Sequence, residues 1–218
     1  MTTAVMIGAT GLVGSKLVQV LLKDERFELV HVFGRKTTGV SHPRLREHLV
    51  DFDAPQAWAP LVKGDVAFSA LGTTLKQAGS QAAQKKVDFD YQWDFAQTAA
   101  KNGVPTYVLV SSASADARSS VFYTRLKGEL DRDVQTLGFE RVRILRPSLL
   151  GGDRPSVRPV ERVSSVLLGA VNALGLARKY REVPGEVVAS AMRNAALDPT
   201  KGTRIITLDD IFIEAERS

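Results

Sequence analysis

A glycine-rich turn near the N-terminus restricts the fold of this chain more than any other feature. The apolar run Ala4–Ile7 is predicted as a strand, the turn Gly8–Gly14 (GATGLVG) follows it at once, and Leu12–Lys23 has the apolar spacing of a helix. Glycines let the backbone come close to a phosphate group, and the free N–H groups of a helix N-terminus bind anions. This order of elements predicts a phosphate-binding βαβ unit, with a tight turn that holds no ligand as the alternative.

Apolar runs and helix-like segments alternate through most of the chain. Strands are predicted at Ala4–Ile7, Glu28–Phe33, Arg46–Val50, Asp65–Ala70, Thr106–Ser111 and Arg141–Leu145, and helices at Leu12–Lys23, Gln81–Asn102 and Val121–Leu137. Most of the strands are rich in Val, Ile, Leu and Phe, as expected when helices cover both faces of a parallel sheet. The predicted fold class is α/β, a Rossmann-like doubly wound parallel sheet with helices on both faces and a small C-terminal elaboration.

The pattern changes after Arg146-Pro147. The later segments are predicted as a loop at 147–160, an apolar helix at Val163–Leu176, a helix at Gly185–Leu197 and a last strand at Thr203–Leu208. We expect residues 1–218 to form a single domain, to which residues 147–218 contribute the substrate side. Core packing is the expected role of Val163–Leu176, with a substrate-pocket wall or a dimer face as the alternatives.

Composition excludes several classes of protein. The 218 residues include no cysteine, which excludes disulfides, thiolate metal sites and cysteine nucleophiles. A net charge of +5, from 29 basic and 24 acidic residues, is too balanced for a nucleic-acid arm. No run approaches the roughly 18 apolar residues of a membrane span, and the start lacks a basic leader, so we expect a cytoplasmic protein. His31, His42 and His48 lack helical ligand spacing, and no metal site is expected.

Residues at the ends of the predicted strands indicate the choice of nucleotide. Sites that prefer NAD usually place a carboxylate after the second strand, but here that strand ends in Gly34-Arg35-Lys36. Arg35 is suited to bind a 2′-phosphate and Lys36 adds positive charge, so NADP(H) is predicted over NAD(H), with an exposed basic loop as the alternative. Asp51 is placed to accept a hydrogen bond from the adenine amino group. Leu71-Gly72 lets the backbone lie beside the ribose and pyrophosphate.

Tyr123 and Lys127 are the strongest candidates for chemistry. They lie four residues apart in a predicted helix, which places both side chains on one face. A lysine ammonium beside a phenol favours the phenolate, and such a tyrosine exchanges a proton with a carbonyl or alcohol during hydride transfer. Ser111 and Ser112 end the preceding strand, where a hydroxyl can position the substrate oxygen. An exposed surface pair is the alternative for Tyr123 and Lys127.

Together these motifs resemble the short-chain dehydrogenase/reductase superfamily, in particular the atypical branch that includes the human HIV Tat-interacting protein. The resemblance covers most of the chain. It is carried by Gly8–Gly14, Gly34-Arg35-Lys36, Leu71-Gly72-Thr73-Thr74, Val87-Asp88-Phe89-Asp90-Tyr91, Ser111-Ser112, Tyr123-Thr124-Arg125-Leu126-Lys127-Gly128-Glu129 and Arg146-Pro147-Ser148-Leu149-Leu150-Gly151.

The resemblance implies a role for each matched residue. Tyr123 matches the proton-transfer tyrosine, Lys127 the lysine that tunes it and binds the nicotinamide ribose, and Ser112, in preference to Ser111, the catalytic serine. Leu150 matches a position beside the nicotinamide and Arg158 a cofactor-proximal arginine. The expected cofactor-binding set is Gly8, Ala9, Thr10, Gly11, Leu12, Val13, Gly14, Arg35, Lys36, Asp51, Leu71, Gly72, Tyr123, Lys127, Leu150 and Arg158.

One departure from the superfamily bears on turnover. Its helix asparagine, which holds a water in the proton relay, has no match here, because Asn102 lies at the wrong end of its helix. We therefore keep three functions open. They are an NADP(H)-dependent oxidoreductase of a carbonyl or alcohol, a non-catalytic NADP(H)-binding redox sensor or scaffold, and a sugar-nucleotide epimerase-like enzyme. The expected partner is a small-molecule substrate, with neither nucleic acid nor membrane, in a monomer or a homodimer.

Overall fold

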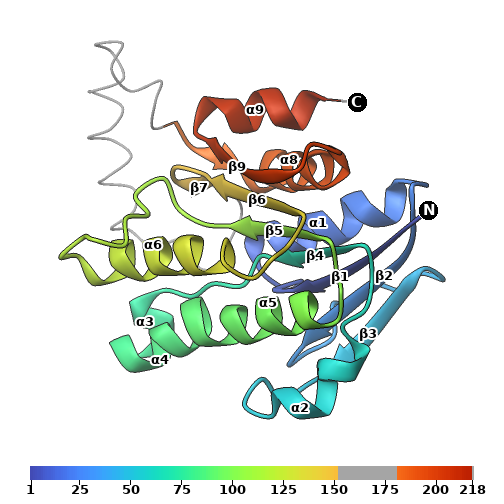
Figure 1. Ribbon diagram of the computed structural model, residues 1–218, viewed down its shortest axis with the longest axis horizontal. Helices are drawn as coiled ribbons and strands as arrows, with labels where there is room; N and C mark the ends of the chain where they lie inside the picture. The colour runs from blue at the N-terminus through green and yellow to red at the C-terminus, as the bar shows by residue number, and fades with distance from the viewer. Residues whose placement is uncertain (152–180, 218) are drawn as a thin grey trace.

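A seven-stranded parallel sheet forms the centre of the computed structural model, which describes residues 1–151 and 181–217 (Figure 1). The strands are β1 (Thr2–Ile7), β2 (Phe27–Gly34), β3 (Leu45–Leu49), β4 (Val66–Ser69), β5 (Thr106–Val110), β6 (Arg141–Arg146) and β9 (Gly202–Thr207). Their order is β3-β2-β1-β4-β5-β6-β9, and every pair is parallel. The predicted Rossmann-like fold is confirmed.

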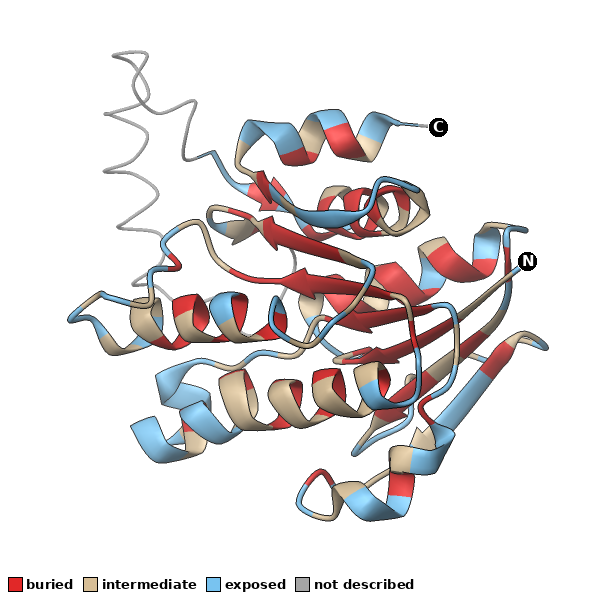
Figure 2. Cartoon of the chain, viewed as in Figure 1, coloured by how far each residue is buried: buried red, intermediate tan, exposed pale blue. Residues whose placement is uncertain are grey.

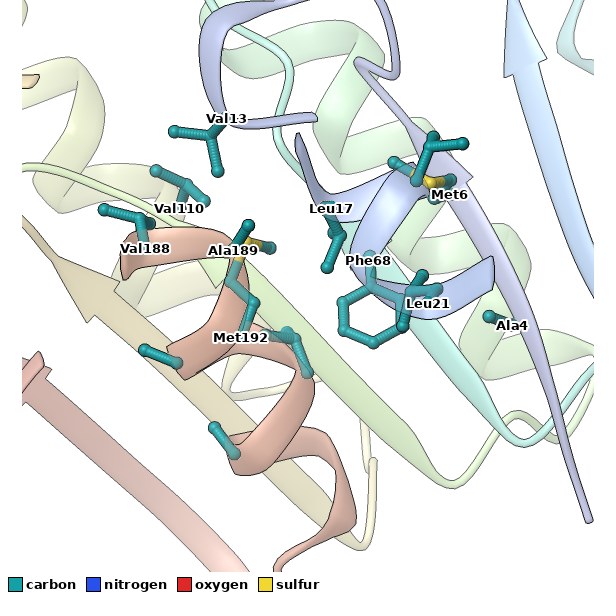
Figure 3. Packing of buried hydrophobic residues seen from close by; sticks show 14 of the residues in the cluster. Ala4, Met6, Val13, Leu17, Leu21, Phe68, Val110, Val188, Ala189 and Met192 are labelled. Carbon is teal, nitrogen blue, oxygen red and sulfur yellow. The ribbon is translucent and has the colours of Figure 1, made fainter. Parts of the chain in front are cut away.

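Helices cover both faces of this sheet. Figure 1 shows α1 (Leu12–Lys23) and α8 (Gly185–Leu197) on one side, and α5 (Tyr91–Lys101) and α6 (Phe122–Val134) on the other. Each side has its own apolar core, and the central strands β1, β4, β5 and β6 are mostly buried between them, whereas the edge strands β3 and β9 are partly exposed (Figure 2). On the α1 side, Leu17 and Leu21 of α1 and Met192 of α8 gather around Phe68 of β4 (Figure 3).

The predicted elements are found with small shifts at their ends, apart from Val163–Leu176, which lies outside the described residues. The predicted helix Gln81–Asn102 is continuous but irregular: α4 (Gln81–Lys85) and α5 are joined by a π-helical segment, η2 (Lys86–Asp90). Six short elements were not predicted, namely α2 (Pro55–Trp58), η1 (Ala59–Leu61), α3 (Leu75–Ala78), α9 (Asp209–Glu216), β7 (Leu150–Gly151) and β8 (Val183–Pro184). The first three are single turns, too short to show a helical apolar period.

Residues 181–217 pack onto the same sheet. β9 pairs with β6 along its whole length, α8 lies against α1, and α9 lies against α8. The side chain of Asn194 in α8 donates to backbone carbonyls at the end of α9, which satisfies groups that a helix terminus leaves unpaired. A two-stranded sheet, β7 (Leu150–Gly151) with β8 (Val183–Pro184), lies beside the carboxyl end of β6.

Arg143 of β6 ties the turn before β9 to the sheet. Its side chain is buried, and its guanidinium donates to the carbonyl oxygens of Asp198, Thr200 and Gly202. Burial lowers the pKa of Arg143, with Asp198 acting in the opposite direction. A buried carbonyl that loses its donor keeps the cost of having left water, so this residue should contribute strongly to stability.

We expect Arg143→Met to lower the free energy of unfolding by about 2–4 kcal/mol, because at least two carbonyl groups lose their donor. Urea denaturation followed by circular dichroism measures the change. Arg141→Met is the matched control, since Arg141 lies on the same strand and, within residues 1–151 and 181–217, its guanidinium donates only to the hydroxyl of Thr106. Equal losses in the two variants would show that the buried carbonyl contacts do not matter.

Candidate active site

A cavity of about 650 Å³ opens at the carboxyl ends of the central strands. The order of the sheet reverses between β1 and β4, and ligands of open α/β sheets bind outside the carboxyl ends at such a switch point. The cavity is lined by Gly11, Leu12, Val13, Ala70, Leu71, Gly72, Thr73, Thr74, Leu75, Gln77, Gln81, Gln84, Asp88, Val110, Ser111, Val121, Phe122, Tyr123, Lys127 and Leu150. It thus brings together the glycine turn, the loop after β4, and the start of α6.

The glycine turn fits the space between β1, α1 and β4 because Gly8 and Gly14 lack a side chain. A Cβ on Gly14 would lie 2.0 Å from the carbonyl oxygen of Gly8, and Gly8 itself has a φ of +85°. A Cβ on Gly8 would lie 2.4 Å from the backbone of Ala70. Gly11 begins α1 without a side-chain cap, and the first turn carries no acidic residue. The turn thus presents uncapped backbone N–H groups, which suits a phosphate.

The residues expected to select the nucleotide lie at the same edge. Arg35 and Lys36 follow β2 and are exposed. Asp51 is also exposed, and one of its carboxylate oxygens accepts the backbone N–H of Asp53 at 2.9 Å. Asp53 binds the ammonium of Lys86 at 2.7 Å and the hydroxyl of Tyr91 at 3.0 Å. Asp53 thus fastens the loop after β3 to the helix that precedes β5.

Tyr123 and Lys127 both line the cavity, as their spacing predicts, but their surroundings differ sharply. Tyr123 is 37% exposed, whereas the side chain of Lys127 is 4% exposed. Nζ of Lys127 lies 3.2 Å from Oδ1 of Asp88, whose side chain is 1% exposed. Burial alone would lower the pKa of Lys127, but the negative charge of Asp88, with a further contribution from Tyr123, raises it overall. Lys127 is therefore held as an ammonium.

Asp88 is the residue at this site that sequence reasoning missed. It lies in η2, and its second carboxylate oxygen accepts the backbone N–H of Thr73 at 3.1 Å. A π-helical segment inside an α-helix often marks a functional site. The sequence carried one signal, because Asp88 belongs to the Val87–Tyr91 segment that supports the resemblance, but nothing in its spacing showed that it faces Lys127.

The two serines after β5 are placed differently. Ser111 lines the cavity, and its hydroxyl is buried without a hydrogen-bond partner among the described residues. The hydroxyl of Ser112 lies 3.1 Å from that of Ser114, and Ser112 is not among the residues that line the cavity. Near Ser111, the buried Asp131 binds Arg146 at 2.8 Å. Burial raises the pKa of Asp131, against the lowering effects of Ser111 and Arg146.

Three further residues were singled out in the sequence, namely Leu150, Arg158 and Asn102. Leu150 lies on β7 and lines the cavity. Arg158 lies outside the described residues. Asn102 ends α5, and its amide donates to the carbonyl oxygens of Ala59 and Val62, so it takes part in packing away from the cavity.

The described residues contain a pair of histidines on adjacent strands, but no cluster of metal ligands. His31 and His48 lie on neighbouring strands with Nδ1 and Nε2 2.8 Å apart, but across residues 1–151 and 181–217 no three His, Asp or Glu side chains gather as metal ligands. Within those same ranges, no helix combines the length and apolar character needed to cross a bilayer.

Comparisons with known proteins agree with this geometry. Residues 3–91 match the family model described as "Semialdehyde dehydrogenase, NAD binding domain". "Protein FMP52, mitochondrial" of Coccidioides immitis is 34% identical to the chain, over 93% of this chain and 89% of that protein. The chain belongs to the FMP52 family. Further fungal FMP52 proteins align over a similar share of the chain.

The FMP52 family corrects one expectation. The expectation of a cytoplasmic protein is wrong, because the FMP52 relatives that align with 92–93% of the chain are named mitochondrial.

Solved structures share the fold of this FMP52-family chain at low sequence identity. A short-chain dehydrogenase/reductase superfamily protein from Agrobacterium tumefaciens with bound NAD has a TM-score of 0.72 at 16% identity, over 94% of this chain and 77% of that one. UDP-glucose 4-epimerase from Thermotoga maritima, with UDP-glucose, has a TM-score of 0.70 at 12% identity, over 97% and 80%. The chain thus shares the Rossmann fold of these proteins, and residues 3–91 match the model of an NAD-binding domain.

We expect Gly14→Ala to lower the free energy of unfolding by about 3 kcal/mol, because its Cβ would overlap the carbonyl oxygen of Gly8 and force α1 away from β1. Gly11→Ala is the control, since its Cβ would meet its nearest neighbour at 3.3 Å, and it should cost about 1 kcal/mol or less. Urea denaturation of both variants provides the comparison. A Gly14 variant as stable as wild type would contradict the close packing of the turn.

Proposed function

We propose that the protein is an NADP(H)-dependent oxidoreductase of the short-chain dehydrogenase/reductase type that acts on a carbonyl or alcohol. One observation carries the proposal: Tyr123 and Lys127 line the same cavity as the glycine turn and the Leu71-Gly72 loop. A proton-transfer pair and a phosphate-binding turn are thus within one site. Kinship with the branch that includes the HIV Tat-interacting protein is part of the proposal and rests on the Tyr123–Glu129 segment.

The residues present fit a dinucleotide. Gly8 and Gly14 close the turn, uncapped N–H groups at the start of α1 face the place of a pyrophosphate, and Gly72 leaves room beside the loop after β4. When bound, the nicotinamide cofactor supplies or accepts the hydride. Tyr123 exchanges the proton with the substrate oxygen, and Lys127 places its ammonium in the same cavity. Leu150 forms an apolar wall of the cavity.

A hydroxyl from the Ser111-Ser112 pair would bind the substrate oxygen. The resemblance assigns this role to Ser112, whereas the position in the cavity supports Ser111. Both serines are therefore candidates.

The preference for NADP(H) rests on the charge after β2. Arg35 and Lys36 are exposed at the carboxyl edge of the sheet, and the end of this strand carries no carboxylate to bind a ribose 2′-hydroxyl. Arginine binds phosphate with two parallel hydrogen bonds, which suits the 2′-phosphate. NAD(H) remains the alternative cofactor, and Arg158 a proposed cofactor contact.

A redox sensor that binds NADP(H) without catalysis is the weaker function. Such a protein needs the glycine turn and Arg35 but has no use for a proton donor such as Tyr123. Taking Lys127 and Asp88 out of water is costly, and the cost is offset only by their contact and by the bonds around them. An ion pair buried at the wall of the cavity therefore supports chemistry over sensing. The epimerase function has support from the shared fold alone, which does not define an activity.

We expect Arg35→Ala to weaken NADPH binding by about tenfold or more, because it removes a charge-assisted contact with the 2′-phosphate. NADH lacks this phosphate and serves as the internal control, with an unchanged Kd. Isothermal titration calorimetry measures all four affinities. Equal loss for both nucleotides would place Arg35 outside the 2′-phosphate site, and no binding of either nucleotide to wild type would overturn the proposal.

We expect Tyr123→Phe to lower kcat by about 10²–10⁴-fold in a screen of carbonyl compounds, while NADPH affinity is retained, because the variant loses the proton donor and little else. Tyr91→Phe is the matched control, since the hydroxyl of Tyr91 binds Asp53 outside the cavity. In the same assay, the larger loss between Ser111→Ala and Ser112→Ala identifies the serine that touches substrate. Full activity of the Tyr123 variant would refute the mechanism.

A further inference from the structure

One carboxylate, that of Asp88, joins the two halves of the site. Its Oδ1 lies 3.2 Å from Nζ of Lys127 on α6, and its Oδ2 accepts the backbone N–H of Thr73, in the loop after β4, at 3.1 Å. The position of a Cβ on Gly72 would be 3.3 Å from Oδ1, so this loop lies directly against the carboxylate. The separation between the lysine and the loop is therefore set by a single side chain.

The backbone of Asp88 is also anchored to the sheet, through the side chain of Gln92. The side-chain amide of Gln92 donates to the backbone carbonyl of Asp88 at 2.9 Å, and the amide oxygen of Gln92 accepts the hydroxyl of Ser69 in β4 at 2.8 Å. Both Gln92 and Ser69 are fully buried. The π-helical segment that carries Asp88 is thus tied to the sheet one turn further along, which leaves the carboxylate little freedom to move.

Asp88 also balances the charge of Lys127. The ionisable groups that face this lysine in the described part of the chain are Asp88 from η2 and Tyr123 and Asp131 from α6. Asp131 is paired with Arg146 of β6 at 2.8 Å, so much of its charge is already compensated. Asp88 is the acid whose oxygen lies in contact with the ammonium. Without it, Lys127 would be a buried cation with no direct counter-charge, which is strongly destabilising.

We propose that Asp88 is a positioning residue for the reaction proposed above: its carboxylate clamps the ammonium of Lys127 to the backbone of the cofactor loop at Thr73. The inference rests on that proposed function. In this chain the charged carboxylate of Asp88, in the continuous helix formed by α4, η2 and α5, contacts the lysine. The superfamily that the chain resembles has a neutral asparagine in its helix. Asp88 touches neither substrate nor the reacting atoms and acts through Lys127 and the loop.

Asparagine cannot replace this carboxylate. An amide has one acceptor oxygen, so it can accept either from Thr73 or from Lys127, and its NH₂ group then faces a donor. The charge is lost as well, so burial lowers the pKa of Lys127 without the opposing effect of Asp88. In Asp88→Asn, Lys127 would therefore lose its proton at a lower pH than in wild type. As the pH rises, the turnover of this variant would begin to fall earlier than that of wild type.

The first test compares the pH profile of kcat/KM in wild type, Asp88→Asn and Asp90→Asn. Asp90 is the matched control, because it lies in the same π-helical segment but pairs with the exposed Lys85, outside the cavity. We expect the alkaline limb of Asp88→Asn to move down by about one pH unit or more and that of Asp90→Asn to stay in place. A uniform loss at every pH in Asp88→Asn, with the limb unmoved, would reduce Asp88 to a structural residue and overturn the proposal.

The second test does not depend on turnover. NADPH affinity of Asp88→Asn should weaken by about tenfold, since the loop that lies beside the cofactor loses its anchor, and the Asp90 variant should match wild type. A double-mutant cycle of Asp88→Asn with Lys127→Met, read from urea denaturation, should show that the double variant loses less stability than the two single losses added together. The double variant contains no lone buried charge, so it should fold even if Asp88→Asn does not.

The outcomes distinguish the clamp from the function on which it rests. Wild type that binds no NADPH overturns the proposed function, and the double-mutant cycle then still reports whether Asp88 and Lys127 are coupled. Wild type that binds and turns over, with an Asp88→Asn variant of unchanged affinity and unchanged pH profile, overturns the clamp alone. Additive losses in the cycle would contradict it as well.

Discussion

The carbonyl oxygen of Gly8 leaves no space for a side chain at position 14, and the rest of the site depends on this contact. Because α1 can lie directly on the turn, its N-terminus points into the crevice between β1 and β4. The same turn touches the backbone of Ala70, so the loops after β1 and β4 share one wall. On the far side, Gly185 at the start of α8 approaches the carbonyl of Leu12, which brings a second helix against the first. Close backbone contacts thus position the cavity before any polar group takes part.

Charge inside the protein is concentrated behind that cavity. Asp88, Lys127, Asp131 and Arg146 form two ion pairs in which three of the four side chains are almost fully buried, and Arg146 is 24% exposed. Isolated buried charges are strongly unfavourable, and well-packed apolar residues often stabilise a core equally well. A chain selected for stability alone would have little reason to keep this arrangement. Its position between the Tyr123 face of α6 and the cofactor loop gives it a chemical use.

The sequence was sufficient for the sheet, for the glycine turn and for the shared helix face of Tyr123 and Lys127, because each depends on local periodicity or on glycine geometry. It was insufficient where partners are distant in the chain. Asp88 and Lys127 are 39 positions apart, and only the packing of η2 against α6 brings them together. The contacts of Asp53 are of the same kind, since its partners Lys86 and Tyr91 lie on another element. The choice between Ser111 and Ser112 depended on side-chain direction after the strand, which no residue pattern encodes.

The π-helical segment Lys86–Asp90 has a further consequence for how the helix is built. A π turn contains about one residue more than an α turn, and one residue corresponds to roughly 100° of rotation. Gln84 before the segment and Gln92 after it are both buried and lie eight positions apart, a spacing that would place them roughly 80° apart around a regular α-helix. The extra residue of the π turn takes up this rotation, so both side chains face inward. Removal of one residue between them would therefore give a regular α-helix in which both side chains still face inward. In an alignment of relatives, the loss of this residue would be seen as a one-residue gap inside an otherwise continuous helix. A substitution leaves no such gap.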